Sequence, residues 1–263
     1  MINSSSNAEL RDARIAQYLK LGDSALILGQ RLSEWCGHSP TEELDVSLTN
    51  IALDSIGQAQ ILLEFAAQLM DATVSADDLA FGRDMMEYRN LLIVEQPNLD
   101  FAQTIARQFL FSTYQLACYR SLSESAQAHK DPDLAGFAEK CTHEVQYHVK
   151  FSSAWMYRLG DGTQESRTRL QRAVQRLMYF TGEFFESRDT DEVLFQTGLG
   201  IDYPSMKQIW LNEITNVIEG STLVMPEQPH TISGHQQGEH TEHLGHLLAD
   251  MQFLHRSYPG FNW

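Results

Sequence analysis

Seven prolines are spread over this 263-residue chain, and the intervals between them are long. Proline removes a backbone donor and clashes with the preceding helical turn, so proline-free intervals are where helices can run uninterrupted. Within these intervals apolar residues recur three and four positions apart, which is the period of an amphipathic helix. The pattern therefore predicts an all-α protein. The prolines lie at positions 40, 97, 132, 204, 226, 229 and 259.

Four of the predicted helices are long. Two of them start with a capping residue followed by proline, Ser39-Pro40 and Asp131-Pro132, because proline is tolerated at the first helical position. Glycine is expected to end the first and the fourth, at Gly37 and Gly160. The four predicted ranges are 15–36, 40–70, 101–127 and 132–159.

Shorter elements are expected around these four helices. A helical stretch is predicted from Ser75 to before Pro97, with a short strand at Leu91–Val94 as the alternative, and residues 189–203 are predicted to be a connection. Further helices are expected over 165–187, 204–224 and 240–257. Two pairs of long helices indicate a four-helix bundle with additional C-terminal helices. We expect one domain over 1–263, made of a flexible N-terminus at 1–10, a bundle core at about 12–160 and appended helices at about 163–258.

The charge balance excludes some partners. Nineteen Lys and Arg against 35 Asp and Glu give a net charge of −16, which repels nucleic acid and anionic membrane surfaces. The longest aliphatic run, Leu91–Val94, is too short to span a bilayer. Three cysteines without a C-x-x-C pair, Cys36, Cys118 and Cys141, indicate reduced thiols. We expect a cytoplasmic protein that binds neither nucleic acid nor membrane.

A long four-helix bundle raises the question of a di-iron site, which needs Glu-x-x-His on two helices and a Glu on each of the other two. Asp54 is the one charged residue between Asp45 and Glu64, but Gly57 stands three positions later. His148 follows Val145 at that spacing, and the helix from Phe101 offers Ser112 in place of a carboxylate. The template fails. We interpret Asp54, Glu144 and His148 as a buried polar network, with a metal site as the alternative.

A polar stripe runs along the otherwise apolar second helix. Asn50, Asp54 and Gln58 are four residues apart, so they share one helix face. The stripe is interpreted either as a solvated edge or as a buried network or a contact between subunits.

Six of the ten histidines lie near the C-terminal end: His230, His235, His240, His243, His246 and His255. Imidazoles three residues apart on a helix can share a zinc ion. The segment His240-Thr-Glu-His243 is not H-E-x-x-H, however, and Glu242 does not stand where that motif places its base. Packing at the start of a helix and contact with a partner are the favoured interpretations, and a metal site is the alternative.

Arg169, Arg172 and Arg176 form the one compact basic stripe of this acidic chain. The stripe is interpreted as a solvated helix face, and the alternative is a contact for an acidic partner or for a substrate phosphate. No nucleophile elbow, phosphate-binding glycine loop or dinucleotide fingerprint is present in the sequence. The chain alone shows no catalytic apparatus.

Four segments carry a resemblance to a known family. They are Glu34-Trp-Cys-Gly-His-Ser-Pro40, Asn50-Ile-Ala-Leu-Asp-Ser-Ile-Gly-Gln-Ala59, Val94-Glu-Gln-Pro-Asn98 with Phe101-Ala-Gln-Thr-Ile-Ala-Arg-Gln108, and His240-Thr-Glu-His-Leu-Gly245. In this order they resemble the C subunits of bacterial 1,2-phenylacetyl-CoA epoxidases, from about Ile15 to Trp263. That family is a ferritin-like component of a monooxygenase complex in aerobic phenylacetate catabolism, an aromatic compound degradation pathway.

The resemblance implies a structural subunit that is not itself catalytic and holds no cofactor. In the family the di-iron centre and the binding site for the CoA thioester lie in a paralogous A subunit. A small B subunit and a reductase with flavin and iron–sulfur groups, which takes electrons from NADPH, complete the complex. At the positions of the metal-ligand motifs of the A subunit, this chain has Asp54, Gly57, Ser112, Val145 and His148. Of these residues, only His148 is the one that the motif requires.

Two other functions remain open at this point, together with self-association of the chain when it is alone. One is an independent ferritin-like metal-dependent oxidoreductase using Asp54, Glu144 and His148. The other is a CoA-thioester-binding helical module using the arginine stripe.

Overall fold

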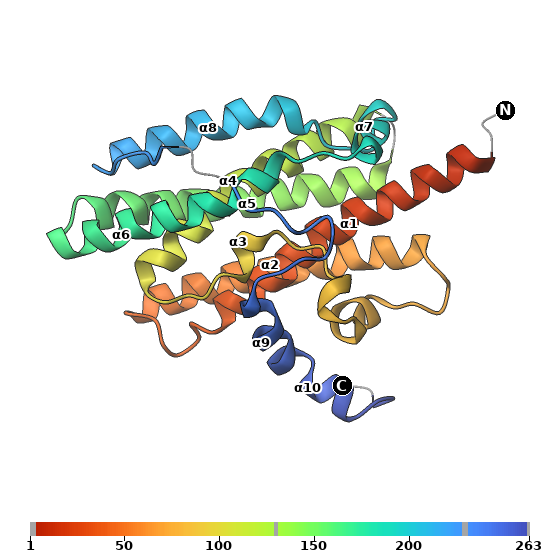
Figure 1. The fold of residues 1–263 in the computed structure, drawn as a ribbon, viewed down its shortest axis with the longest axis horizontal. Coiled ribbons are helices and arrows are strands. Elements are labelled where there is room, and N and C mark those ends of the chain that lie inside the picture. Colours follow the sequence, from red (N-terminus) through yellow and green to blue (C-terminus); the bar gives the residue numbers. More distant parts are fainter. Residues whose placement is uncertain (1–3, 129–130, 228–230, 262–263) are drawn as a thin grey trace. The chain divides into compact units, whose positions relative to one another are not determined.

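A computed structural model describes residues 4–128, 131–227 and 231–261, and within these ranges every regular element is a helix, as predicted (Figure 1). Two compact units divide the chain. Unit 1 combines the chain up to Pro97 with the segment from Ser233 onward, and unit 2 is Asn98–Ile232. The predicted single domain over 1–263, with its bundle core and appended helices, stays a prediction.

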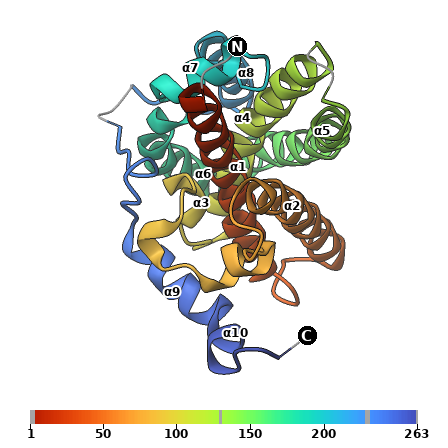
Figure 2. The same cartoon turned by 90° about the vertical axis from the view of Figure 1, so that its right-hand side faces the viewer.

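Unit 1 is built on the helices α1 (Ser4–Ser33) and α2 (Glu42–Leu69), which lie side by side (Figures 1 and 2). Leu28 and Ile51 are among their fully buried residues. Gly29 allows the close approach, because a Cβ at this position would lie 2.8 Å from Cγ1 of Ile56. The helix pair therefore buries a continuous apolar stripe.

The starts of α1 and α2 differ from the prediction. Helix α1 already begins at Ser4, so residues 4–10 are helical although they were expected to form a flexible end. Helix α2 begins at Glu42, and its N-cap is Thr41 rather than Ser39. Thr41 is extended, and its hydroxyl accepts from the Leu44 amide at 3.4 Å, which fixes the first turn two residues later than expected.

The segment predicted as helical from residue 75 to before Pro97 is helical only in short pieces, and the alternative of a strand at Leu91–Val94 was wrong. It forms a π-helical turn (Asp78–Gly82), a 3₁₀ turn (Met85–Glu87) and the short helix α3 (Leu92–Glu95). Side chains of α1 capture its backbone: the Arg89 amide donates to Asp23 Oδ2 at 2.8 Å and the Leu91 amide to Ser24 Oγ at 3.1 Å. These bonds take the place of intrahelical ones.

The C-terminal part of unit 1 is also broken. The range predicted as one helix, 240–257, contains α9 (Glu242–Met251) and α10 (Phe253–Ser257). Between them Gln252 is buried, and its Nε2 donates to the Arg83 carbonyl and to the Tyr88 hydroxyl, both at 2.9 Å. Gln252 thus contacts Arg83 and Tyr88 at the point where α9 ends and α10 begins.

Unit 2 is built on α4 (Phe101–Ala128) and α5 (Pro132–Gly160), which lie side by side. The predicted start of α5 is confirmed, because Asp131 Oδ1 accepts from the Leu134 amide at 3.1 Å and Pro132 is the first helical residue. Helix α8 (Tyr203–Gly220) is held on α4 by Trp210, whose Nε1 donates to the Leu110 carbonyl at 3.1 Å.

Two smaller helices complete unit 2. Helix α6 (Gln164–Leu177) is shorter than the predicted 165–187 and continues as the 3₁₀ turns Met178–Phe180 and Gly182–Phe185. Helix α7 (Asp189–Gln196) lies where a connection was predicted. The first 3₁₀ turn begins directly after Leu177, and Thr181 Oγ1 donates to the Met178 carbonyl at 2.9 Å.

No helix in the described ranges combines the length and the apolarity needed to cross a bilayer.

Candidate functional site

The predicted site residues of α2 belong to unit 1 and differ in exposure. Asn50 is exposed, Asp54 is half-buried and Gln58 is buried. The stripe therefore turns gradually from solvent into the core. A Cβ at Gly57 would meet nothing within 4 Å, so no neighbour packs tightly against this position. Glycine itself supplies no side-chain ligand for a metal.

The other predicted positions belong to unit 2, on α4 and α5. Ser112 is buried, donates to the Gln108 carbonyl at 2.6 Å and accepts from Gln108 Nε2 at 2.7 Å. Val145 and His148 are fully buried, whereas Glu144 is half-buried and lies 3.2 Å from Lys140 Nζ. A network joining Asp54 to Glu144 and His148 spans two separately described units, so it stays a prediction.

These residues do not fit a di-iron centre. Such a centre needs carboxylates and imidazoles that converge from four helices. Gly57 has no side chain, Val145 is apolar, and the Ser112 hydroxyl is engaged with Gln108 on its own helix. Across residues 4–128, 131–227 and 231–261 no three His, Cys, Asp or Glu side chains come close enough to hold a metal ion.

The described structure instead contains a buried ionic network in unit 1 that no sequence pattern predicts. Asp23 on α1 is fully buried and accepts from both terminal nitrogens of Arg83, with Nη1 at 3.0 Å from Oδ2. Burial alone would lower the pKa of Arg83, but the Asp23 carboxylate raises it above its ordinary value. Arg83 stays charged, and its guanidinium also lies 4.4 Å from the centre of the Tyr88 ring.

Tyr88 connects this pair to the junction of α9 and α10. Its hydroxyl donates to the Ala80 carbonyl and accepts from Gln252 Nε2 at 2.9 Å. Burial raises the pKa of Tyr88 to about 12, although the nearby Arg83 charge opposes the shift. The phenol is therefore neutral at physiological pH and acts as a structural hydrogen-bonding group.

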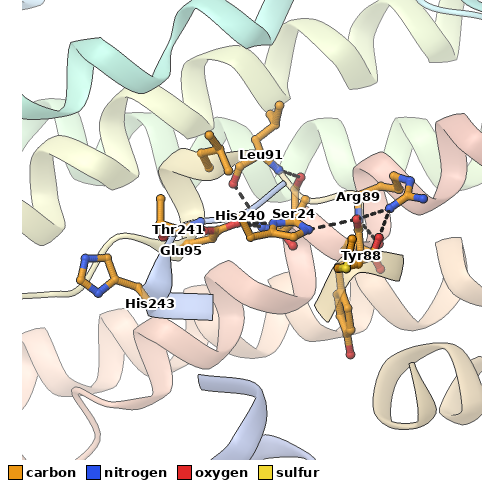
Figure 3. Close-up of polar contacts among 12 residues, drawn as sticks. Ser24, Tyr88, Arg89, Leu91, Glu95, His240, Thr241 and His243 are labelled. Carbon is orange, nitrogen blue, oxygen red and sulfur yellow. Dashed lines mark hydrogen bonds and ion pairs between the residues drawn. The ribbon is translucent and has the colours of Figure 1, made fainter. Parts of the chain in front are cut away.

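The carboxylate of Glu95, at the end of α3, forms the second part of the network (Figure 3). His240 Nδ1 lies 2.6 Å from its Oε1, and Asn90 Nδ2 donates to the same oxygen at 2.9 Å. The amide and hydroxyl of Thr241 donate to Oε2 at 2.8 and 2.6 Å. We name Asn90, Glu95, His240 and Thr241 the Glu95 clasp. It fastens the segment before α9 to the segment before α4.

Both ring nitrogens of His240 have a polar neighbour. Its Nδ1 faces a carboxylate and its Nε2 lies 3.2 Å from the Tyr88 carbonyl, so both neighbours are acceptors. The arrangement thus uses both ring nitrogens of His240 and both carboxylate oxygens of Glu95, and it leaves no open position on these groups for a substrate or a metal.

Arg31 supports the clasp from α1. Its Nε and Nη2 donate to the Glu95 carbonyl at 3.0 and 2.8 Å, and Nη2 also reaches the His243 carbonyl at 3.2 Å. Its Nη1 pairs with Glu34 at 2.7 Å. One guanidinium therefore holds three separate segments of unit 1.

The histidine cluster is thereby resolved in part. His240 precedes α9, which begins at Glu242, so His240 and His243 do not share a helix face as assumed for zinc. Packing of His240 at the start of the helix is the favoured interpretation that the structure confirms. His235 is buried, His246 is exposed and His255 contacts the Phe81 ring, whereas His230 lies outside the described residues.

The arginine stripe lies on α6 in unit 2. Arg169, Arg172 and Arg176 are exposed, and all three line a cavity of about 300 Å³. Arg169 Nε donates to Glu165 at 2.7 Å, and this bond raises the pKa of Arg169. The arginine stripe is thus exposed and forms part of the wall of a cavity.

Two comparisons with known sequences place the chain in a family. The sequence profile of the family described as phenylacetic acid catabolic protein matches residues 2–263. The chain is also 43% identical over 248 residues to the C subunit of the 1,2-phenylacetyl-CoA epoxidase of Escherichia coli K12, and the matched region covers 94% of this chain and 98% of that protein. The chain therefore belongs to the phenylacetic acid catabolic protein family.

Proposed function

We propose that this chain is a non-catalytic structural subunit of a 1,2-phenylacetyl-CoA epoxidase in the cytoplasm. In this role it pairs with the di-iron A subunit and supports it, together with the small B subunit and the reductase. The di-iron centre belongs to the A subunit, and NADPH, flavin and the iron–sulfur group belong to the reductase. This chain contributes no catalytic group.

One observation carries the proposal: the 43% identity to the C subunit of an epoxidase extends over nearly the whole of both chains. The similarity is not confined to one motif. Two segments that carry the resemblance, Val94–Asn98 and His240–Gly245, meet in the Glu95 clasp.

The residues at the expected ligand positions support a role without chemistry. Gly57, Ser112 and Val145 offer no carboxylate or imidazole, and Ser112 is already engaged with Gln108. The buried ionisable groups instead have protein partners, Arg83 for Asp23 and His240 for Glu95. A supporting subunit needs this kind of rigidity and no open site.

Co-expression with an A subunit tests the proposal. We expect the two chains to elute together in size-exclusion chromatography. With the B subunit, the reductase, NADPH, O₂ and phenylacetyl-CoA, we expect epoxidation that requires both chains. Iron analysis should assign about two ions to the A subunit.

An independent oxidoreductase would give a different result. If this chain alone retains about two irons after chelation and its ferrous form consumes O₂, it is an independent oxidoreductase. In that case Asp54→Ala and His148→Ala should abolish O₂ consumption. If the chain is a scaffold, these variants should leave the epoxidase activity of the assembled complex intact as long as they fold.

A further inference from the structure

One cavity of unit 2 carries features that a purely supporting subunit does not require. It measures about 300 Å³ and lies beside α6 and the start of α4. Its lining includes Leu99, Asp100, Gln103, Arg169, Arg172 and Arg176. All of these residues belong to the same unit.

Two cations of the cavity are unassigned. Arg169 is neutralised by Glu165 at 2.7 Å and lies 3.7 Å from Asp100. Arg172 and Arg176 make no ion pair with any described residue, and they stand four residues apart on one face of α6. In a chain with a net charge of −16, two such guanidinium groups at one cavity mark a place for an anion.

A buried amide adds an independent observation. Gln103 is only 2% exposed, lines the cavity, and its Nε2 has no hydrogen-bond partner among the described residues. A buried donor without an acceptor costs stability. An oxygen-rich group in the cavity would supply that acceptor. The Asp100 carboxylate does not, because it caps α4 by accepting from the Gln103 backbone amide at 2.9 Å.

The mouth of the cavity is apolar. Leu99 has a φ of 52°, a left-handed conformation that is uncommon for a residue other than glycine, and it is 64% exposed. Such local strain persists only where the surrounding structure maintains it, and it clusters at functional positions. Here it holds an aliphatic side chain at the edge of a cationic cavity.

We propose that this cavity binds the phosphate group of a phosphorylated small molecule. Arg172 and Arg176 contact the phosphate oxygens, because a guanidinium fork matches phosphate geometry. Gln103 donates to a further oxygen, and Leu99 covers the organic part of the ligand. The volume suits a phosphate or diphosphate with a portion of its organic group, and it is too small for a helix of a partner protein.

Isothermal titration of the full chain tests the site, with pyrophosphate and phenyl phosphate as probes. The double variant Arg172→Gln/Arg176→Gln should weaken binding of both probes by about tenfold or more. Gln103→Leu should weaken both, and Leu99→Ser should weaken phenyl phosphate only. The matched control is Arg120→Gln/Lys207→Gln, which removes two exposed cations of the same unit outside the cavity and should leave affinity unchanged. Thermal melts monitor folding.

Three results overturn the proposal. Equal losses in the control variant mean unspecific attraction of anions. Unchanged affinity in the folded arginine variant means that the stripe is a solvated surface. A hexaglutamate peptide that binds at the stripe while pyrophosphate does not means an acidic protein partner. Because binding is measured on the isolated chain, its failure leaves the co-elution test of the proposed function intact, and the reverse also holds.

Discussion

The imidazole of His240 and the carboxylate of Glu95 form a pair with Nδ1 and Oε1 2.6 Å apart, and both side chains are fully buried. The two residues are 145 positions apart in the sequence. Removing one partner leaves the buried polar group of the other without its hydrogen bond, and the desolvation of that group is then not compensated. The Glu95 clasp therefore determines whether the C-terminal segment stays docked on unit 1.

His240→Ala should lower the free energy of unfolding by about 1–3 kcal/mol or more, because the buried Glu95 carboxyl group would lose a hydrogen-bond partner. Chemical denaturation measures the change, and hydrogen exchange should report faster opening of 240–252. His246→Ala is the matched control, since His246 is exposed on the adjacent helix, and it should change stability by less than about 0.5 kcal/mol. Equal effects of the two substitutions would show that the clasp does not stabilise the unit.

Gly160→Ala should destabilise unit 2. A Cβ at Gly160 would lie 1.9 Å from the Ser221 carbonyl oxygen. Relieving this clash requires a shift of the backbone, which costs more than a change of side-chain rotamer. We expect a loss on the order of 1–3 kcal/mol or more. Gly136→Ala on the same helix should instead stabilise by about 0.5–1 kcal/mol, because nothing lies within 4 Å and alanine has the higher helix propensity. Thermal denaturation of both variants gives the comparison, and a stable Gly160→Ala protein would contradict the close approach of α5 to Ser221.

Asp54→Ala should cost about 1–3 kcal/mol if the half-buried carboxylate is hydrogen-bonded in the folded chain. Asn50→Ala, at the exposed end of the same stripe, should cost less than about 0.5 kcal/mol. Denaturant midpoints of the two variants separate the cases. A loss at Asp54 as small as that at Asn50 would mean that this carboxylate is merely solvated.

Stability should fall at alkaline pH. Tyr88 holds its proton up to a pKa of about 12 in the folded chain and ionises near 10 when unfolded, so the unfolded state loses its proton first. The stability linked to Tyr88 is present below pH 10 and decreases by roughly 2–3 kcal/mol as the pH rises to 12. Burial also raises the pKa values of Tyr114, Tyr119 and Tyr203.

Denaturation at several pH values and absorbance titration of the phenolates measure this effect. Tyr88→Phe should reduce the slope of stability between pH 10 and 12 without removing it, because the other three tyrosines remain. The substitution should also lower stability at neutral pH, since the Gln252 and Ala80 bonds are lost. An unchanged alkaline slope would place the Tyr88 phenol in solvent.

Local chemistry made several elements readable from the sequence. Asp131 and Pro132 start α5 because a capping carboxylate and a residue without an amide hydrogen suit a helix start, whatever the chain packs against. The three-and-four spacing of apolar residues likewise predicts the long helices, since it follows from helix geometry alone. The mismatch with the di-iron ligand pattern at Gly57 and Val145 can also be read from the sequence, because neither residue has a side chain that binds a metal.

Tertiary contacts decided the rest. Residues 88–95 look helical or extended in isolation, but Asp23 and Ser24 capture their amides from a distant helix. Asp23 was a detectable signal, as an isolated acid in an apolar stretch of α1, but its partner Arg83 is 60 residues away and no period connects them. Only the folded chain brings His240 to Glu95 and a buried Gln103 beside Arg172. Sequence determines which residues can form a helix, whereas burial determines which charges must find each other, because an unpaired charge is costly only where water is excluded.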